Sequence, residues 1–271
     1  MTPDSSIARP TVEDLADLLT GRQVCVLTGA GCSTESGIPD YRGPETARRA
    51  RNPIQFSQFR DDAAWRSRYW ARSAIGWPKM RAARPNAGHL ALARLGWPII
   101  TQNVDGLHTE AGAHDVIELH GSLDGVVCLS CGHRTSRADL QATILRDNPH
   151  LVGRTAALAP DGDADLVTGA TVPDCTECGG VLKPDVVFFG ENVPRPRVER
   201  ALQWTRDADV LLVVGSSLTV FSGYRFVKRA RQWGKHIAIV NLGPTRGDPL
   251  ADLKLEHGAG EVLSALQARL G

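Results

Sequence analysis

The sequence predicts an α/β protein built on a Rossmann-like, doubly wound parallel sheet, with a small cysteine-bearing module and a helical insertion. Short apolar runs alternate with helical stretches along most of the chain, and two segments interrupt this alternation. The chain has 271 residues, of which 42% are hydrophobic and 23% charged, so it is long enough to bury one large core.

The predicted strands are short apolar runs that stop at polar or glycine-rich turns. They cover residues 23–28, 98–101, 210–214 and 237–240. Helix-like stretches are expected at residues 87–95, 198–207, 224–233 and 261–270. A further helix, capped by Thr11 and closed by Gly21, precedes the first strand. Strands and helices that alternate in this way indicate a parallel sheet with helices on both faces.

Two stretches are candidate insertions into this pattern. Residues 45–85 are rich in Arg and Trp and are expected to form helices laid over the sheet, whereas residues 122–185 hold paired cysteines and a turn-rich loop. The expected organisation is a Rossmann-like domain formed by residues 1–44, 86–121 and 186–271, a helical insertion at 45–85 and a cysteine module at 122–185.

The formal net charge of +1 gives no field that would draw the whole molecule to nucleic acid or to an anionic membrane. No apolar run approaches the length of a membrane span, and the first ten residues lack the features of a leader. We therefore expect a cytoplasmic protein, a monomer, without membrane or direct nucleic-acid partners.

Four of the six cysteines form two Cys-x-x-Cys pairs, Cys128 with Cys131 and Cys175 with Cys178. In a reducing compartment this spacing favours metal over disulfides. Two such knuckles give a four-sulfur tetrahedral site with no position left for water or substrate, so we expect one structural Zn²⁺ that holds a small zinc-binding module together. A nucleic-acid-binding ribbon is disfavoured, because the module lacks interleaved aromatic and basic residues and its insertion is acidic.

A glycine-rich turn, Gly29-Ala30-Gly31-Cys32-Ser33, follows the first predicted strand. Its backbone amides can approach a pyrophosphate where a side chain would obstruct it. The usual dinucleotide fingerprint is incomplete, because Thr34 replaces the third glycine and no acidic residue closes a second strand, which disfavours an ordinary dehydrogenase. Residues 34–42 lack the apolar period of a helix and are typical of a segment that covers a cofactor.

Polar residues follow two further strands. Asn103 and Asp105, two apart in an extended segment, point to the same side; they grip the ribose and amide of a nicotinamide nucleoside or cap a following helix. His120 stands just after the next strand, where an imidazole can accept a proton from a ribose hydroxyl. A lone histidine is ordinarily structural, and we assign that role to the other seven.

Residues 29–42, which read Gly-Ala-Gly-x-Ser-x-x-Ser-Gly-Ile-Pro-Asp-Tyr-Arg, resemble the cofactor loop of the sirtuins. The resemblance continues in family order through residues 183–191, 215–220 and 241–245, and so covers about residues 22 to 260. It implies a protein-lysine deacylase that consumes NAD as a co-substrate. The acyl oxygen of a modified lysine in a protein or peptide attacks the nicotinamide ribose, and the products are nicotinamide, O-acyl-ADP-ribose and free lysine.

The resemblance also implies residue roles. His120 is the catalytic base, and Asn103 and Asp105 position the nicotinamide ribose and carboxamide. The implied NAD contacts are Gly29, Ala30, Gly31, Ser33, Glu35, Ile38, Asp40, Tyr41, Arg42, Gln102, Asn103, Asp105, Gly215, Ser216, Ser217, Asn241, Leu242, Gly243 and Ala259. The implied substrate contacts are Val187, Phe188, Phe189, Gly190 and Glu191, where a strand over 186–189 pairs with an extended peptide or is simply a core strand.

Several segments, among them residues 34–36, 68–72, 158–163 and 222–226, look most like the class II branch, that of the mitochondrial sirtuin four. That branch is credited with removing bulky or acidic acyl groups. Tyr69 and Arg72 have the spacing of a Tyr-x-x-Arg pair that binds an acyl carboxylate in the acid-selective branch; the alternative is that both merely pack or face solvent. A mono-ADP-ribosyltransferase and a non-catalytic NAD-binding module remain the competing functions.

Overall fold

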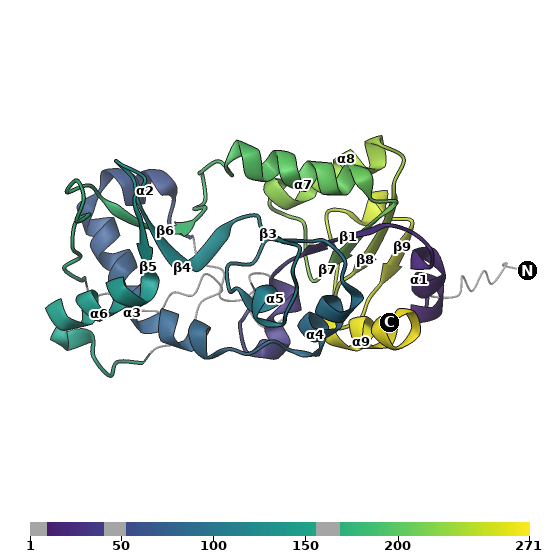
Figure 1. The fold of residues 1–271 in the computed structure, drawn as a ribbon, viewed down its shortest axis with the longest axis horizontal. Coiled ribbons are helices and arrows are strands. Elements are labelled where there is room, and N and C mark those ends of the chain that lie inside the picture. The colour runs from purple at the N-terminus through teal and green to yellow at the C-terminus, as the bar shows by residue number, and fades with distance from the viewer. Residues whose placement is uncertain (1–9, 41–52, 156–168) are drawn as a thin grey trace, which may run out of the picture.

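The computed structural model describes residues 10–40, 53–155 and 169–271. Its main sheet has six strands in the order β3-β2-β1-β7-β8-β9 (Figure 1). Every pairing in it is parallel, which confirms the predicted doubly wound sheet. In that order the strands are Val116–Glu118, Ile99–Thr101, Val24–Thr28, Val210–Val214, His236–Val240 and Leu253–Leu255.

Helices cover both faces of this sheet because successive strand side chains point to opposite sides. In β1, Val24 and Val26 pack with one set of helices, and Cys25 and Leu27 pack with the other. Figure 1 shows α4 and α9 below the sheet and α7 and α8 above it. The first set is α1 (Val12–Leu19), α4 (Ala87–Leu95) and α9 (Ala259–Leu270), and the second is α7 (Arg195–Asp207) and α8 (Phe221–Gln232).

The first helix begins where the sequence predicts. The Thr11 hydroxyl accepts a hydrogen bond from the Asp14 amide at 3.3 Å, and the Asp14 carboxylate accepts one from the Thr11 amide at 2.8 Å. This reciprocal capping box satisfies two amides that a helix end otherwise leaves unpaired.

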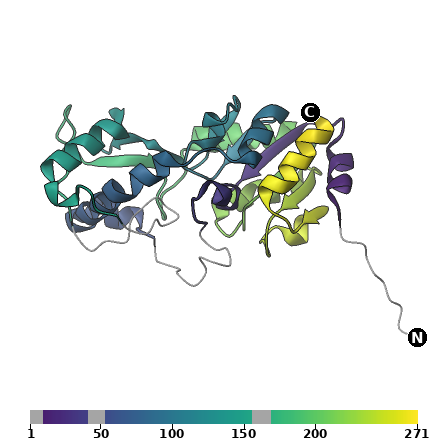
Figure 2. The same cartoon turned by 90° about the horizontal axis from the view of Figure 1, so that it is seen from below.

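A second, smaller sheet lies at the other end of the molecule, in the antiparallel order β5-β4-β6 (Figures 1 and 2). Its strands are Arg134–Ser136, Gly121–Cys128 and Leu182–Val186. Near it lie α2 (Phe56–Asp61), α3 (Ala63–Ala82) and α6 (Arg137–Asp147), whereas the short α5 (Leu107–Glu110) belongs to the main-sheet end. No helix of the described ranges is both long and apolar enough to cross a membrane.

The helical insertion forms helices, as predicted, but they do not lie over the main sheet. Phe59 and Trp70 from α2 and α3 are fully buried in one hydrophobic cluster with Ile144 of α6 and Val126 of β4. The Arg137 guanidinium lies 5.3 Å from the Trp70 ring. The expected position was therefore wrong, because the aromatic side of α3 completes a core that the small sheet cannot fill alone.

The predicted strand at residues 186–189 is also wrong in its bounds. The strand is β6, which ends at Val186, where it pairs with Gly121, the first residue of β4. Beyond this point the Val187 amide donates to the His120 carbonyl at 2.7 Å, and Phe189 forms an isolated bridge with Gln55 outside the strands. The chain leaves the ladder here because its partner turns away toward β3.

Candidate active site

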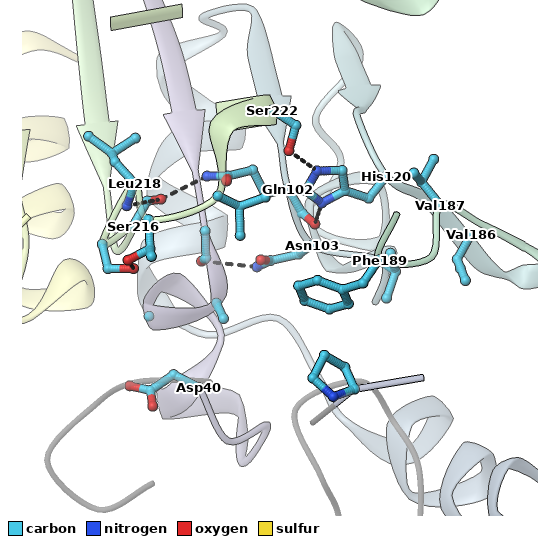
Figure 3. Close-up of a pocket in the computed structure, with 18 of the residues that line it drawn as sticks. Asp40, Gln102, Asn103, His120, Val186, Val187, Phe189, Ser216, Leu218 and Ser222 are labelled. Carbon is cyan, nitrogen blue, oxygen red and sulfur yellow. Dashed lines mark hydrogen bonds between the residues drawn. The ribbon is translucent and has the colours of Figure 1, made fainter. Parts of the chain in front are cut away.

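A cavity of about 730 Å³ lies at the carboxyl ends of β1, β2, β7 and β8, between the two sheets (Figure 3). Each of these strands ends in a polar or glycine-rich turn that lines the cavity. Open parallel sheets bind ligands at this edge. The cavity therefore brings together segments that the sequence presents more than two hundred residues apart, from Gly29 to Gly243.

The glycine turn after β1 packs directly on the turn after β7. The Gly31 amide donates to the Gly215 carbonyl at 2.9 Å. A Cβ on Gly31 would lie 2.9 Å from that carbonyl oxygen, and one on Gly29 would lie 2.8 Å from it. Both glycines are thus required for the contact between two turns that form one cavity wall. This packing requires glycine at both positions independently of any ligand.

Asn103 and Asp105 meet Ser33 in a hydrogen-bonded cluster. The Asn103 amide donates to the Gly29 carbonyl at 3.1 Å and to the Ser33 hydroxyl at 3.0 Å, and that hydroxyl donates to Asp105 Oδ2 at 2.8 Å. Asp105 Oδ1 accepts from the Leu107 amide at 3.0 Å, at the start of α5. Asp105 thus accepts from the first turn of α5 and also lines the cavity, and its contact with a nucleoside stays a prediction.

His120 faces the cavity with both ring nitrogens engaged. Nδ1 lies 2.8 Å from the Gln102 carbonyl oxygen, and Nε2 lies 2.7 Å from Ser222 Oγ. Burial lowers the pKa of His120 below its ordinary value. The bond to the Gln102 carbonyl raises this pKa in part, and the positive charges of Arg197 and Arg225 lower it further. The imidazole is therefore neutral at physiological pH, the form in which it can accept a proton.

Most of the residues expected to bind ligands line this cavity. Besides His120, Asn103 and Asp105, they are Gly29, Ala30, Gly31, Ser33, Ile38, Asp40, Gln102, Gly215, Ser216, Ser217, Asn241, Leu242 and Gly243 on the expected NAD side, and Tyr69, Val187, Phe188, Phe189, Gly190 and Glu191 on the expected substrate side. Tyr41 and Arg42 lie outside the described residues.

Three expected contacts do not line the cavity: Glu35, Ala259 and Arg72. Glu35 Oε1 instead accepts from the Gly260 amide at 3.1 Å, in the first turn of α9, and Ala259 is buried beside it. Tyr69, which does line the cavity, packs edge-on against the rings of Phe59 and Phe188.

Ser222 and Arg225, from the first turns of α8, line the cavity and were not expected to be site residues. Within the described parts of the chain, the buried Nε of Arg225 has no hydrogen-bond partner. The sequence signal was the polar turn Ser222-Gly223-Tyr224-Arg225, which follows the motif at residues 215–220 without a break.

The four module cysteines converge on one point. Cys128 Sγ lies 3.5 Å from Cys178 Sγ, Cys131 Sγ lies 3.8 Å from Cys175 Sγ, and all four sulfurs lie within 4.8 Å of one another. Zn–S bonds of about 2.3 Å in a tetrahedron place sulfurs about 3.8 Å apart. The Ser130 amide also donates to Cys128 Sγ at 3.4 Å, as a knuckle requires. The donor set and its spacing fit a tetrahedral zinc ion.

With this geometry established, comparison with known proteins assigns the class. The sequence matches the Sir2 family over residues 29–222. It is 50% identical to the NAD-dependent protein deacetylase 1 of Mycobacterium avium (strain 104), with 98% of each chain covered. It is also 46% identical to the NAD-dependent protein deacylase Sirt4 of Drosophila melanogaster, over 95% of this chain and 88% of that protein.

The fold agrees. A solved structure described as "Sir2-p53 peptide-NAD+" superposes with a TM-score of 0.76 at 30% identity, covering 96% of this chain and 98% of that one. Another, "Sir2 bound to acetylated peptide", gives a TM-score of 0.74 at 28% identity, over 96% and 98%. The chain belongs to the Sir2 family, the sirtuins, which confirms the resemblance drawn from its motifs.

Proposed function

We propose that this chain is an NAD-dependent protein-lysine deacylase. The observation that carries the proposal is His120, held as a neutral imidazole at the wall of a cavity where the ends of four parallel strands meet. The relatives of this chain in bacteria and in Drosophila are named NAD-dependent deacetylases or deacylases, which supports the same activity.

The cavity residues fit a dinucleotide. The wall made by Gly29, Gly31 and Gly215 offers backbone without side chains, which suits a pyrophosphate, and the turn after β8 offers Asn241 near an adenosine. When bound, NAD supplies the anomeric carbon that the acyl oxygen attacks as nicotinamide leaves. Asn103 and Asp105 orient the nicotinamide ribose, and His120 takes a proton from its hydroxyls.

Exclusion of water by the apolar wall and by the bound substrates would favour acyl transfer over hydrolysis of NAD. Apolar residues such as Leu123 and Phe188 line its wall, while Asn103 at its polar end is only 9% exposed. A dry site strengthens the hydrogen bonds that orient the substrates and withholds the water that would compete with the acyl oxygen.

We assign the acylated lysine to the side lined by residues 187–191. Glu191 fixes this segment, because its Oε2 accepts from the Phe188 amide at 2.9 Å and pairs with Lys183 Nζ at 3.0 Å. Relatives at 50% and 46% identity are named a deacetylase and a deacylase, respectively. On the class II-like segments of the sequence we include acyl groups larger than acetyl among the substrates to be tested. Tyr69 lines the cavity and Arg72 follows it by three residues on α3, so an acyl carboxylate bound by this pair stays a prediction for the acidic peptides of the panel.

We further propose that the four cysteines hold one structural Zn²⁺. The site is closed, since four protein sulfurs complete a tetrahedron. Cys128 ends β4 opposite Leu182 at the start of β6, so metal bonds to Cys128 and to the knuckle just before β6 would tie the central strand of the small sheet to this neighbour.

The test is a panel of acyl-lysine peptides with NAD, in which HPLC follows nicotinamide and mass spectrometry identifies the second product. Release of nicotinamide with O-acyl-ADP-ribose, dependent on the peptide and lost in His120→Ala, is the expected result. ADP-ribose attached to protein would instead indicate mono-ADP-ribosyl transfer. Tight NAD binding without nicotinamide across the whole panel would leave only an NAD-binding module.

A further inference from the structure

The proton on His120 can be placed from its two partners. The Gln102 carbonyl oxygen carries no hydrogen, so the 2.8 Å contact requires that Nδ1 carry one and donate it. In the neutral ring Nε2 then holds the lone pair. Ser222 Oγ, at 2.7 Å from Nε2, is therefore the donor of that bond. Figure 3 draws both contacts of the imidazole as dashed lines.

The only basic nitrogen of His120 is thus already occupied by a hydroxyl of the protein. Ser222 also lines the cavity and is partly exposed, so its oxygen keeps two lone pairs for a second hydroxyl. A hydroxyl that accepts on one side and donates on the other can pass a proton without moving a heavy atom.

Gln102, whose carbonyl orients the imidazole, also fixes the position of Ser222, because its side chain packs against the neighbouring Gly223. Gly223 packs so tightly on the Gln102 side chain that a Cβ there would lie 2.3 Å from its Oε1. The Gln102 amide in turn donates to Ser216 Oγ at 2.8 Å and to the Thr28 carbonyl at 3.2 Å. One residue of the β2 turn therefore sets the distance between the serine and the histidine.

We propose that Ser222 is a proton relay between the ribose hydroxyl of the substrate and His120. In this step the ribose O–H bond breaks and its proton passes to Ser222 Oγ, while the Ser222 proton passes to His120 Nε2. The ribose oxygen keeps the electron pair, and the imidazolium that forms still donates through Nδ1 to the Gln102 carbonyl. The relay rests on the proposed deacylase function.

Ser222→Ala and Ser222→Thr test the relay in the full chain. The base acts after nicotinamide has left, so Ser222→Ala should keep the exchange of labelled nicotinamide into NAD while it slows formation of deacylated peptide about 10- to 100-fold. Ser222→Thr restores a hydroxyl and should return product formation to within a few-fold of the parent. In the Ser222→Ala, His120→Ala double variant the losses should not add, since both residues serve one transfer.

Three outcomes would overturn the relay. Product formation at the parental rate in Ser222→Ala would show that His120 takes the proton directly, and a faster rate would show that Ser222 restrains the base. An equal loss of nicotinamide exchange and product formation would assign Ser222 a role in holding the cavity only. Failure of the parent protein to release nicotinamide with any acyl peptide would instead refute the proposed function, and the relay with it.

Discussion

At the residue scale, the state of His120 sets the pH dependence. Its pKa is lowered from the ordinary value of 6.5, with burial as the largest cause, so the neutral base persists at pH values where a free imidazole is half protonated. Activity should therefore be lost only as the pH falls below 6.5. A profile of kcat/KM against pH, which reports the free enzyme, checks this. An acid limb centred above pH 7 would contradict a buried base.

Gly31 gives a second prediction at this scale. Gly31→Ala places a Cβ 2.9 Å from the Gly215 carbonyl oxygen, a backbone atom that cannot move aside alone. Overpacking of this kind costs about 1–3 kcal/mol, so we expect a Tm lower by about 2–12 °C and a large loss of NAD-dependent turnover.

The matched control is Gly258→Ala, whose Cβ would have only Glu35 Oε1 nearby, at 3.6 Å, on a backbone with φ of −62°. Because Gly258 is the N-cap of α9, this variant should lose at most about 1 kcal/mol, and it should keep its turnover. Equal losses in both variants would mean that the β1 and β7 turns are not held by backbone contact.

Some site residues could be predicted from the sequence to lie together, and others could not. Asn103, Asp105 and His120 follow strand ends, and the parallel sheet alone brings strand ends together, so their meeting could be predicted. The bond from Ser222 to His120 joins residues 102 apart and depends on the angle at which α8 leaves β7. Glu35, a polar side chain inside the binding motif, has a structural partner that the sequence does not indicate, the Gly260 amide of α9.

At the element scale, the interior strands were predictable because both faces are buried and the residues form continuous apolar runs. All five residues of β1 and of β7 are buried. The outer strand Leu253–Leu255 is short and only partly buried, which leaves no such run. The small sheet escaped prediction because an irregular register between Gly121 and Val126 breaks the pattern of β4 and because its packing partners come from distant helices.

The link between Glu35 and α9 is a prediction at this scale. Glu35 Oε1 accepts from the Gly260 amide at 3.1 Å, where a helix carries unpaired amides and partial positive charge. Glu35→Ala should lower stability by about 1 kcal/mol, a Tm change of about 2–4 °C, and Glu35→Gln should lower it less. Thermal unfolding measures the stability of both variants. NAD titration checks that their affinity for NAD is unchanged. An unchanged Tm with lost NAD affinity would return Glu35 to the cofactor contacts.

At the scale of the whole molecule, the site is formed by both the main-sheet part and the small-sheet part. The main sheet supplies the turns that line one side of the cavity, and the segment after β6 lines the other (Figure 3). The two ends are joined next to the base itself, where the Val187 amide donates to the His120 carbonyl at 2.7 Å. The position of the cavity residues that follow β6 therefore depends on the small sheet being folded.

This coupling predicts the effect of removing the metal. A chelator strong enough to take zinc from four thiolates should release one ion per chain and free the end of β4 from the knuckle before β6, because the proposed metal bonds are what join Cys128 to Cys175 and Cys178. Trp70 and Trp77, which pack in the same cluster, should report the loss as a fluorescence change, and turnover should fall with it. Cys128→Ser should reproduce the effect, whereas Cys25→Ala, which alters a buried thiol of the main sheet, should keep its zinc. A Cys128→Ser protein that stays metal-loaded, folded and fully active would show that the small sheet stands without the ion, and that the cavity does not depend on it.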